Sequence, residues 1–254
     1  MIKRMLSLIP KLLIPAVIAS LLVLPACTTS TPSSPATPAQ IASYTIADST
    51  GDWGYPSPYL HYSRGPGYTR MSFIFETLVW KDASGFIPQL AKEWEYVQEE
   101  NAYIFKLHNN VTWHDGEKFT AEDIVFTIDY VKAHPNPFVT LIGPSGIREA
   151  VAIDDYTAKL YLEQPYAPFL HDVAGTLAII PKHIWEGIDD PKSLTGPEAV
   201  IGTGPYTLAD YSKEHGTYLY KAYDDYYLGR PIVDEIKFVK ISAVSYTHLT
   251  LPTN

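Results

Sequence analysis

Residues 111–124 read VTWHDGEKFTAEDI and carry the strongest local structural signal in the chain. Asp115-Gly116 is a dipeptide typical of tight turns between apolar segments. Thr120 is a favourable helix N-cap, and Asp123 stands three residues later, where a carboxylate can bond back to the capped backbone N–H. Isoleucine or valine then recurs at positions 124, 128 and 131, along one face of a helix. The stretch therefore predicts a strand, a turn and a capped helix.

The composition is that of an ordinary globular protein, since 46% of the 254 residues are hydrophobic and 19% are charged. This length allows one large domain or two modest ones. Residues 1–26 hold three basic residues and no acidic ones, so the remainder has a formal net charge of −12 against −9 for the whole chain. A chain this acidic argues against a nucleic-acid partner.

The N-terminus predicts a secretory lipoprotein signal over residues 1–26. Its three basic residues precede or enter an apolar run over 12–24, which is too short for a comfortable membrane span. The run ends at Leu24-Pro25-Ala26-Cys27, which resembles the bacterial lipobox, and Cys27 is the only cysteine. We expect cleavage before Cys27 and lipidation of its thiol, which would anchor the protein to a membrane. The alternative is an ordinary secretory signal that ends in a chance cysteine.

The lipid anchor and a Ser/Thr/Pro-rich tether occupy residues 27–40, and the folded part is expected to begin near Ile41. Periodicity beyond that point predicts strands over 43–47, 93–97, 102–107, 151–154, 157–162, 177–180, 205–211, 217–223 and 236–241. Helical spacing is found over 68–78, and short helices are expected over 167–173 and 181–185.

The last residues, 244–254, look foreign to the gene. Residues 244–253 read VSYTHLTLPT, which resembles an in-frame translation of the transposon-end adapter used in sequencing libraries. We expect the gene-derived sequence to stop near Ala243 and the chain to be the N-terminal portion of a longer protein. A natural Thr-rich ending is the alternative, and the nucleotide record would distinguish the two.

Seven motifs occur in the order and at the spacing of one protein family. They are FETLV at 75–79, PQLAKEWE at 88–95, FKL at 105–107, the stretch at 111–124, IPKH at 180–183, GTGPY at 202–206 and DDYYLGRP at 224–231. Together they resemble the family 5 solute-binding proteins, the extracytoplasmic receptors of peptide and nickel ABC importers. Trp113 stands where the family usually has Phe, Glu93 where it has Ser, and Asp224 where Asn is common.

The resemblance implies an α/β fold of the class II periplasmic-binding-protein type with an extra N-terminal α+β domain. Residues 41–68 and 177–243 would form parts of the first ligand-binding lobe, and residues 69–176 the extra domain. The second lobe would be missing, because family members are roughly twice this length. Much of the ligand-contacting surface would be missing with it.

Catalytic signatures are lacking in the sequence: it has no Gly-x-Ser-x-Gly, no His-Glu-x-x-His and no Walker loop. Gly202-Thr203-Gly204-Pro205 superficially suggests a phosphate cradle, but Pro205 removes a backbone donor, so a turn into a strand is expected. His114 is expected to bond within its turn rather than bind metal. His61 and His183 would matter only if the receptor bound a nickel chelate. We expect no enzyme activity, no cofactor and no metal site.

The best ligand-binding candidates follow the first strand, because ligands of open α/β sheets bind at the carboxyl ends of strands. Aromatic side chains there give sequence-tolerant contact, and loop amides can bond a peptide backbone. The alternative is that the aromatic side chains wedge the loop onto its domain. The candidate residues are Trp53, Tyr55, Ser57, Tyr59, Tyr68 and Arg70.

The predicted function is capture of a peptide-like solute and its delivery to an ABC permease, outside the cytoplasm of a bacterium and beside the membrane. Closure of two lobes would supply the affinity. A nickel-chelate or other small-solute receptor of the same fold, a peptide-sensing surface lipoprotein and, least favoured, a lipoprotein enzyme remain alternatives.

Overall fold

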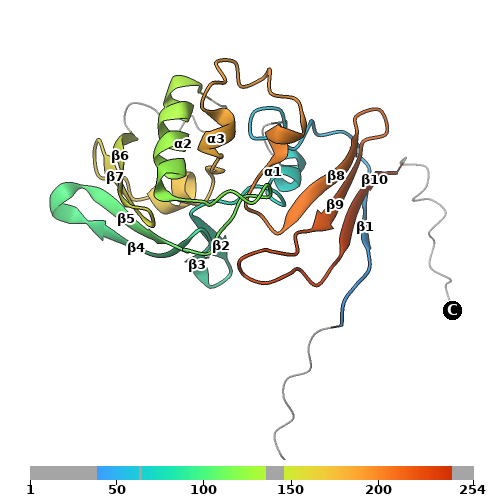
Figure 1. The fold of residues 1–254 in the computed structure, drawn as a ribbon, viewed down its shortest axis with the longest axis horizontal. Helices are drawn as coiled ribbons and strands as arrows, with labels where there is room; N and C mark the ends of the chain where they lie inside the picture. The colour runs from blue at the N-terminus through green and yellow to red at the C-terminus, as the bar shows by residue number, and fades with distance from the viewer. Residues whose placement is uncertain (1–38, 63–64, 136–145, 242–254) are drawn as a thin grey trace, which may run out of the picture. The chain divides into compact units, whose positions relative to one another are not determined.

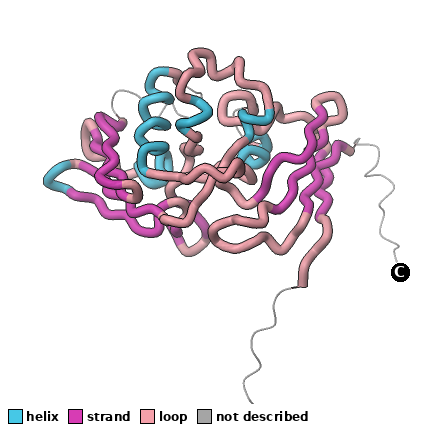
Figure 2. The backbone as a smooth tube through the Cα atoms, in the orientation of Figure 1, coloured by secondary structure: helices cyan, strands magenta, loops and turns pink. Residues whose placement is uncertain are grey.

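The computed structural model of the chain describes residues 39–62, 65–135 and 146–241 (Figure 1). These residues form two four-stranded sheets, a two-stranded hairpin and three α-helices, connected by long loops (Figure 2). The expected mixed α/β fold is confirmed. The predicted signal peptide, Cys27 and the segment 244–254 lie outside the described residues. Within the described ranges, no helix has the length and apolar content needed to cross a membrane.

The first sheet is antiparallel, with the strand order β4-β5-β7-β6. Its strands are β4 (Ala91–Val97), β5 (Ala102–Leu107), β6 (Ile147–Asp154) and β7 (Thr157–Leu162). Both hairpins predicted from alternating residues are present. A 3-10 turn over Gln98–Glu100 joins β4 to β5, and Asn101 ends it in the left-handed conformation with φ 49°.

Helix α2 (Ala121–Ala133) packs against β6 and β7 (Figure 1). Its apolar face, with Ile124 and Ile128 fully buried, meets this sheet as the spacing predicted. The predicted capping box is formed: the Thr120 N–H donates to Asp123 Oδ2 at 2.9 Å, and the Thr120 side chain accepts from the N–H of Asp123.

The predicted turn at Asp115-Gly116 is also present, with Gly116 at φ 91°. The strand expected before it is absent, because the two arms of the turn meet only in an isolated bridge between Thr112 and Lys118. The N–H of Trp113 donates to the carbonyl of Glu117 at 2.8 Å, and a ladder this short does not extend into a strand.

The second sheet has the order β1-β10-β9-β8 and unites the two ends of the described chain. Strand β1 runs parallel to β10, with Tyr44 opposite Ile236, whereas the other pairs are antiparallel. All four strands were expected from the sequence. They are β1 (Tyr44–Asp48), β8 (Tyr206–Ser212), β9 (Thr217–Ala222) and β10 (Glu235–Lys240).

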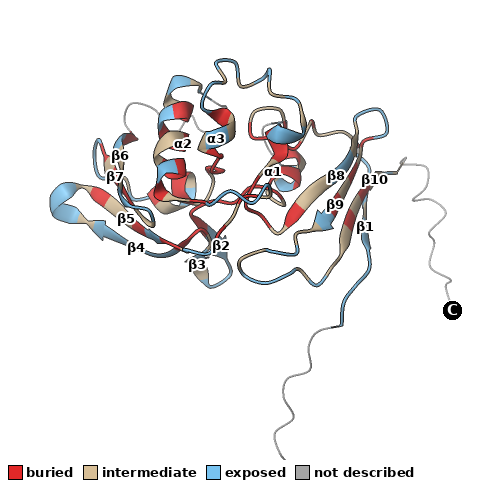
Figure 3. Ribbon diagram, in the orientation of Figure 1, coloured by how far each residue is buried: buried red, intermediate tan, exposed pale blue. Residues whose placement is uncertain are grey.

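Each sheet has its own hydrophobic core (Figure 3). The first core lies between α2 and the sheet β4-β5-β7-β6, and the second is rich in aromatic rings such as Tyr218, Tyr220 and Phe238. The segment 71–79 passes from one core to the other, since Phe75 is buried in the second core and Leu78 in the first.

The path of segment 71–79 shows that the prediction of a helix over 68–78 is wrong. Helix α1 covers only Pro66–Met71. Past it, the carbonyl of Phe73 accepts from the N–H of Tyr206 at 3.1 Å, and that of Ile74 from the N–H of Gly204 at 2.8 Å. Helical spacing therefore continues in the sequence, but tertiary hydrogen bonds from a distant segment take the carbonyls that a longer helix would use.

Residues 177–180 are buried as expected but form no strand. The backbone N–H of Ile179 donates to the backbone carbonyl of Glu76, and that of Ile180 donates to the Thr127 hydroxyl, so no strand ladder develops. The helix expected over 167–173 is a π-helical turn at Leu170–Ala174, and α3 spans Lys182–Trp185. A hairpin that the sequence did not predict joins β2 (Val79–Asp82) to β3 (Gly85–Pro88), and a further 3-10 turn covers Pro197–Val200.

Candidate functional site

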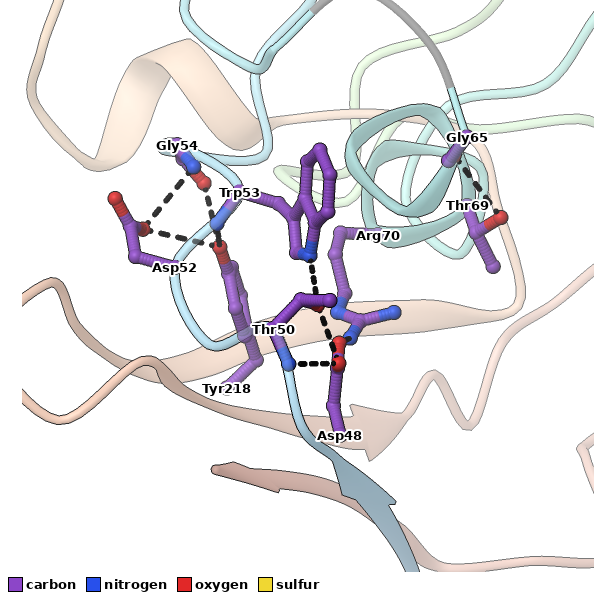
Figure 4. Close-up of polar contacts among 9 residues, drawn as sticks. All are labelled: Asp48, Thr50, Asp52, Trp53, Gly54, Gly65, Thr69, Arg70 and Tyr218. Atoms are coloured by element: carbon purple, nitrogen blue, oxygen red, sulfur yellow. Dashed lines mark hydrogen bonds and ion pairs between the residues drawn. The ribbon is translucent and has the colours of Figure 1, made fainter. Parts of the chain in front are cut away.

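The loop after β1 leads into α1, and the two ends of this connection are held by an ion pair (Figure 4). Arg70 on α1 donates from Nη2 to Asp48 Oδ2 at 2.5 Å. Arg70 is 4% exposed, and its guanidinium carbon lies 3.5 Å from the ring centroid of Phe238 on β10. A carboxylate and an aromatic face therefore share one buried cation.

The other oxygen of Asp48 holds the start of the loop. Asp48 Oδ1 accepts from the backbone N–H of Thr50 at 2.8 Å and also from the Thr50 hydroxyl. Partial burial alone would raise the pKa of Asp48, but the bonds from Thr50 and the charge of Arg70 outweigh it and lower that pKa. Asp48 is therefore a carboxylate that stays ionised and is already occupied by protein donors.

Trp53 is fixed at both its backbone and its ring (Figure 4). Its Nε1–H donates to the Thr50 hydroxyl at 2.6 Å, and its backbone N–H donates to the Tyr218 hydroxyl at 2.7 Å. The Tyr218 hydroxyl also lies 3.2 Å from Asp52 Oδ1 and 2.9 Å from the Gly54 carbonyl. The indole remains half-buried and is thus a pre-positioned aromatic surface beside α1.

Two open depressions meet at the beginning of α1, where both are lined by Gly65 and Thr69. One runs over the end of β1 and includes Asp48 and Arg70. The other runs toward the β2–β3 hairpin and the end of the π-helical turn, and its lining includes Tyr68, Trp80, Phe86 and His171. An extended ligand that crossed the start of α1 would find backbone groups flanked by aromatic side chains.

The other predicted site residues lie deeper or elsewhere. Ser57 is fully buried, and Tyr59 packs on Trp185 while its hydroxyl donates to the His134 carbonyl at 3.1 Å. Burial raises the pKa of Tyr59. Tyr55 donates to the Gly196 carbonyl at 3.3 Å and lines a separate depression. Trp53 therefore lies beside α1, which carries Tyr68 and Arg70, whereas Ser57 and Tyr59 turn inward.

The two depressions together are called the groove at α1. Tyr68 lines this groove with its ring, because its hydroxyl is engaged elsewhere. The hydroxyl donates to the Thr176 carbonyl at 3.2 Å, and burial raises its pKa to about 12. It is therefore neutral throughout the physiological range, and no acid–base role follows from its position.

Sequence reasoning missed Asp48, Thr50, Asp52 and Tyr218. The pairs Asp48/Thr50 and Asp52/Gly54 could have been found, since a carboxylate two residues before a backbone N–H is a common turn signal. Tyr218 could not, because it lies on β9 and only the parallel pairing of β1 with β10 brings it near the loop.

The expected hydrogen bond of His114 within its own turn is wrong, because its two ring nitrogens bond Gly202 and Gly204 of a distant segment. His61 and His183 are also held by protein partners. A ring nitrogen of His61 lies 2.7 Å from the Ser57 carbonyl, and burial lowers the pKa of His61. His183 Nε2 lies 2.8 Å from Asp115 Oδ2 at the surface. Among residues 39–62, 65–135 and 146–241, no three His, Cys, Asp or Glu side chains are grouped so that they could hold a metal ion.

Comparison with known proteins adds a family. Residues 85–250 match the family described as bacterial extracellular solute-binding proteins, family 5 middle. The chain is 33% identical over 189 residues to the dipeptide-binding protein of Escherichia coli K12. The aligned region covers 66% of this chain and 35% of that relative. The chain thus spans about a third of this curated relative's length.

Solved structures show the same fold. The oligopeptide-binding protein AppA of Bacillus subtilis, in complex with a nonapeptide, superposes with a TM-score of 0.71 at 23% identity, over 81% of this chain and 41% of that one. NikA of Brucella suis, in complex with Fe(III)-EDTA, gives a TM-score of 0.68 at 23% identity, over 80% and 40% of the two chains.

Proposed function

This chain belongs to the bacterial extracellular solute-binding proteins of family 5, and from that premise we propose that it is part of the solute-capturing component of an ABC importer. Members of this family are extracytoplasmic binding proteins, not enzymes. The solute is peptide-like, and the protein delivers it to the transmembrane permease. The single observation that carries the choice of peptide is the similarity to a dipeptide-binding protein at 33% identity.

The start of α1 is the first half of the ligand site in this proposal. The groove there offers Tyr68, Trp80 and Phe86 as aromatic surfaces and no free carboxylate at Asp48, which suits an extended backbone of varied sequence. Trp53 lies beside α1 as a further candidate contact. Ser57 and Tyr59 support the loop from beneath. Tyr55 stays a candidate contact at the neighbouring depression.

Most members of the two cores follow the domain division expected from the sequence, whereas Leu177 and Ile179 belong to the first core and Met71, Ile74, Phe75 and Tyr130 to the second. We infer that residues 41–68 and 177–243 belong to the first lobe and residues 69–176 to the extra domain, with segment 71–79 as the passage between them. A second lobe, outside this chain, would close over the groove and exclude water. Affinity would then depend on residues of both lobes.

The N-terminal sequence supports an anchored location. We infer that Cys27 carries the lipid and that residues 28–40 tether the folded part to the outer face of a bacterial membrane. Globomycin, which blocks the lipoprotein signal peptidase, should make the precursor accumulate at its full mass. Processing that continues unchanged in its presence would contradict the lipid anchor.

A nickel-chelate receptor is the second candidate, and it is favoured by the similarity in fold to NikZ of Campylobacter jejuni, solved in complex with Ni(L-His). A peptide-sensing lipoprotein without a transport role is the third, and adjacent permease and ATPase genes would argue against it. The experiment that separates a peptide receptor from a nickel-chelate receptor is native mass spectrometry of the complete gene product as isolated. Peptides released from it support the proposal, whereas a nickel complex or no ligand of peptide mass contradicts it.

A further inference from the structure

The turn Gly202-Thr203-Gly204 joins the two cores and is packed against backbone on both sides. A Cβ on Gly202 would lie 2.0 Å from the Ile74 carbonyl oxygen, and one on Gly204 would lie 2.6 Å from it. On the other side, the N–H of His114 donates to the Gly202 carbonyl at 2.9 Å. The turn therefore lies between segment 73–76 and the Asp115-Gly116 turn of the first core.

Glu76 faces this turn from one side. It is 1% exposed, and its Oε1 accepts from the hydroxyl of Tyr226 at 2.7 Å, from that of Tyr227 at 3.3 Å and from the Gln89 amide at 3.3 Å. Among the described residues, neither Glu76 Oε2 nor the hydroxyl of buried Thr203 makes a hydrogen bond. Burial is the largest influence and raises the pKa of Glu76 to about 7, although the hydrogen bonds from Tyr226, Gln89 and Tyr227 act in the opposite direction.

His114 faces the turn from the other side. Its Nδ1 lies 3.3 Å from the N–H of Gly202 and must accept from it, so the ring proton is on Nε2, which donates to the Gly204 carbonyl at 2.9 Å. Protonation of Nδ1 would set two donors against each other. Burial lowers the pKa of His114 by more than the carbonyls of Gly204 and Val200 and the charge of Asp115 raise it.

Few other titratable groups face these two side chains. Around Glu76 they are Tyr226 and Tyr227, and behind Tyr227 lies the ring of His108 at 5.2 Å. Around His114 they are the Tyr223 ring, at 4.9 Å, and Asp115, whose carboxylate is paired with His183. Burial raises the pKa of Tyr226 and of Tyr227, so both are neutral donors wherever Glu76 titrates.

We propose that Gly202-Thr203-Gly204 is a proton-sensitive joint between the two cores, closed when Glu76 is protonated and His114 is neutral, and loosened when either becomes charged. In this state, His114 holds the turn by two uncharged hydrogen bonds, and segment 73–76 holds it through the bond from the Gly204 N–H to the Ile74 carbonyl. The Glu76 carboxyl is buried in that segment beside Thr203, in a dry environment where an unpaired charge is costly. The joint lies away from the groove at α1 and does not depend on which solute the protein binds.

The two groups act in opposite directions with pH. Glu76 has a raised pKa in the folded state, so its contribution to stability is complete below its ordinary value of 4.5 and is lost as pH rises through about 7. His114 has a lowered pKa, so its contribution is present above its ordinary value of 6.5 and is lost as pH falls. Between these limits the two contributions to the pH dependence of stability partly cancel in the wild-type chain. Substituting Glu76 or His114 alone therefore reveals the contribution of the other residue.

The test is urea unfolding of the 254-residue chain from pH 4.5 to 7.5 for wild type, Glu76→Gln, His114→Gln and the double variant. Relative to wild type, the folding constant of Glu76→Gln should rise by a factor on the order of 100 from pH 4.5 to 7. That of His114→Gln should fall over the same range. Glu214→Gln and His215→Gln, exposed in the turn after β8, are the matched controls and should show neither slope.

Hydrogen exchange localises the effect and does not require the variants to fold. In wild type above pH 7, protection corrected for intrinsic rates should fall at the amides of Gly204 and Tyr206 while it holds along β5. A Glu Cδ carbon signal that titrates near pH 7 should accompany it. The proposal would be overturned if the folding constants of Glu76→Gln and His114→Gln changed with pH no more than those of the controls. It would also be overturned if protection from exchange changed equally at Gly204 and along β5.

Discussion

Arg70 Nη2 donates to Asp48 Oδ2 across 2.5 Å, and this pair fixes the distance between the end of β1 and helix α1. The two partners are unequal, because Arg70 is 4% exposed whereas Asp48 lies nearer the solvent and also binds Thr50. The connection that the pair closes carries Trp53, so the ion pair supports the candidate site without being available to a ligand.

Replacing the two partners should have unequal effects. Asp48→Ala leaves a buried guanidinium without its anion and should lower the free energy of unfolding by about 3 kcal/mol. Arg70→Met keeps an apolar stem against Phe238 and leaves Asp48 with its Thr50 donors, so the loss should be smaller. Chemical denaturation at pH 7 measures both, and a larger loss for Arg70→Met would contradict this reading.

The same pair predicts a dependence on acid. The pKa of Asp48 is lowered in the folded state, so its contribution is complete above its ordinary value of 3.8 and disappears as pH falls through the lower folded value. Asp48→Asn should therefore lose stability relative to wild type at pH 7 and approach it at low pH. A difference that stays constant with pH would show that the carboxylate charge contributes nothing.

Position 202 should require glycine because a side chain there would collide with the Ile74 carbonyl, not because of its backbone conformation. Gly202→Ala would place a methyl group 2.0 Å from the Ile74 carbonyl, so the turn or segment 73–76 must move, which costs about 1–3 kcal/mol or more. Gly187→Ala is the matched control, because nothing lies within 4 Å of its added Cβ. Equal melting temperatures for the two variants would contradict the packing at the joint.

Most of the fold could be predicted from the sequence, because its elements are specified locally. The capping box at Thr120 and Asp123 and the alternating strands of both hairpins need only short-range pattern. Elements that depend on distant partners were predicted wrongly: α1 stops at Met71 because Gly204 and Tyr206 bond to Ile74 and Phe73. No local sequence pattern indicates that these hydrogen bonds from a distant segment will compete with the helix.

The candidate site shows the same division. A loop rich in aromatic residues after the first strand was visible in the sequence, but which aromatic residues face outward was not. Tyr59 turns inward because its hydroxyl donates to the His134 carbonyl and its ring packs on Trp185, and Ser57 is fully buried. Tyr218 joins the loop from 165 residues away, through sheet pairing that no spacing reveals.

Trp53 and Tyr59 should separate ligand binding from support of the loop. In the complete gene product, Trp53→Ala should weaken peptide binding about tenfold, equivalent to about 1.4 kcal/mol, because the half-buried indole beside α1 is removed from the proposed ligand site. Tyr59→Phe removes only the bond to the His134 carbonyl and should lower stability while leaving affinity unchanged. Affinities that change in the opposite order would place the ligand at the other end of the loop.

Calorimetric titration of the complete gene product with a set of di- to pentapeptides, and in parallel with nickel–histidine, tests the peptide-receptor function most directly. We predict saturable peptide binding by the complete protein, little or none by the 254-residue chain because it spans only part of the length of its relatives, and no response to the nickel complex. Tight binding of nickel–histidine without peptide binding, or equal peptide affinity for the chain alone, would contradict a peptide receptor that closes two lobes on its solute.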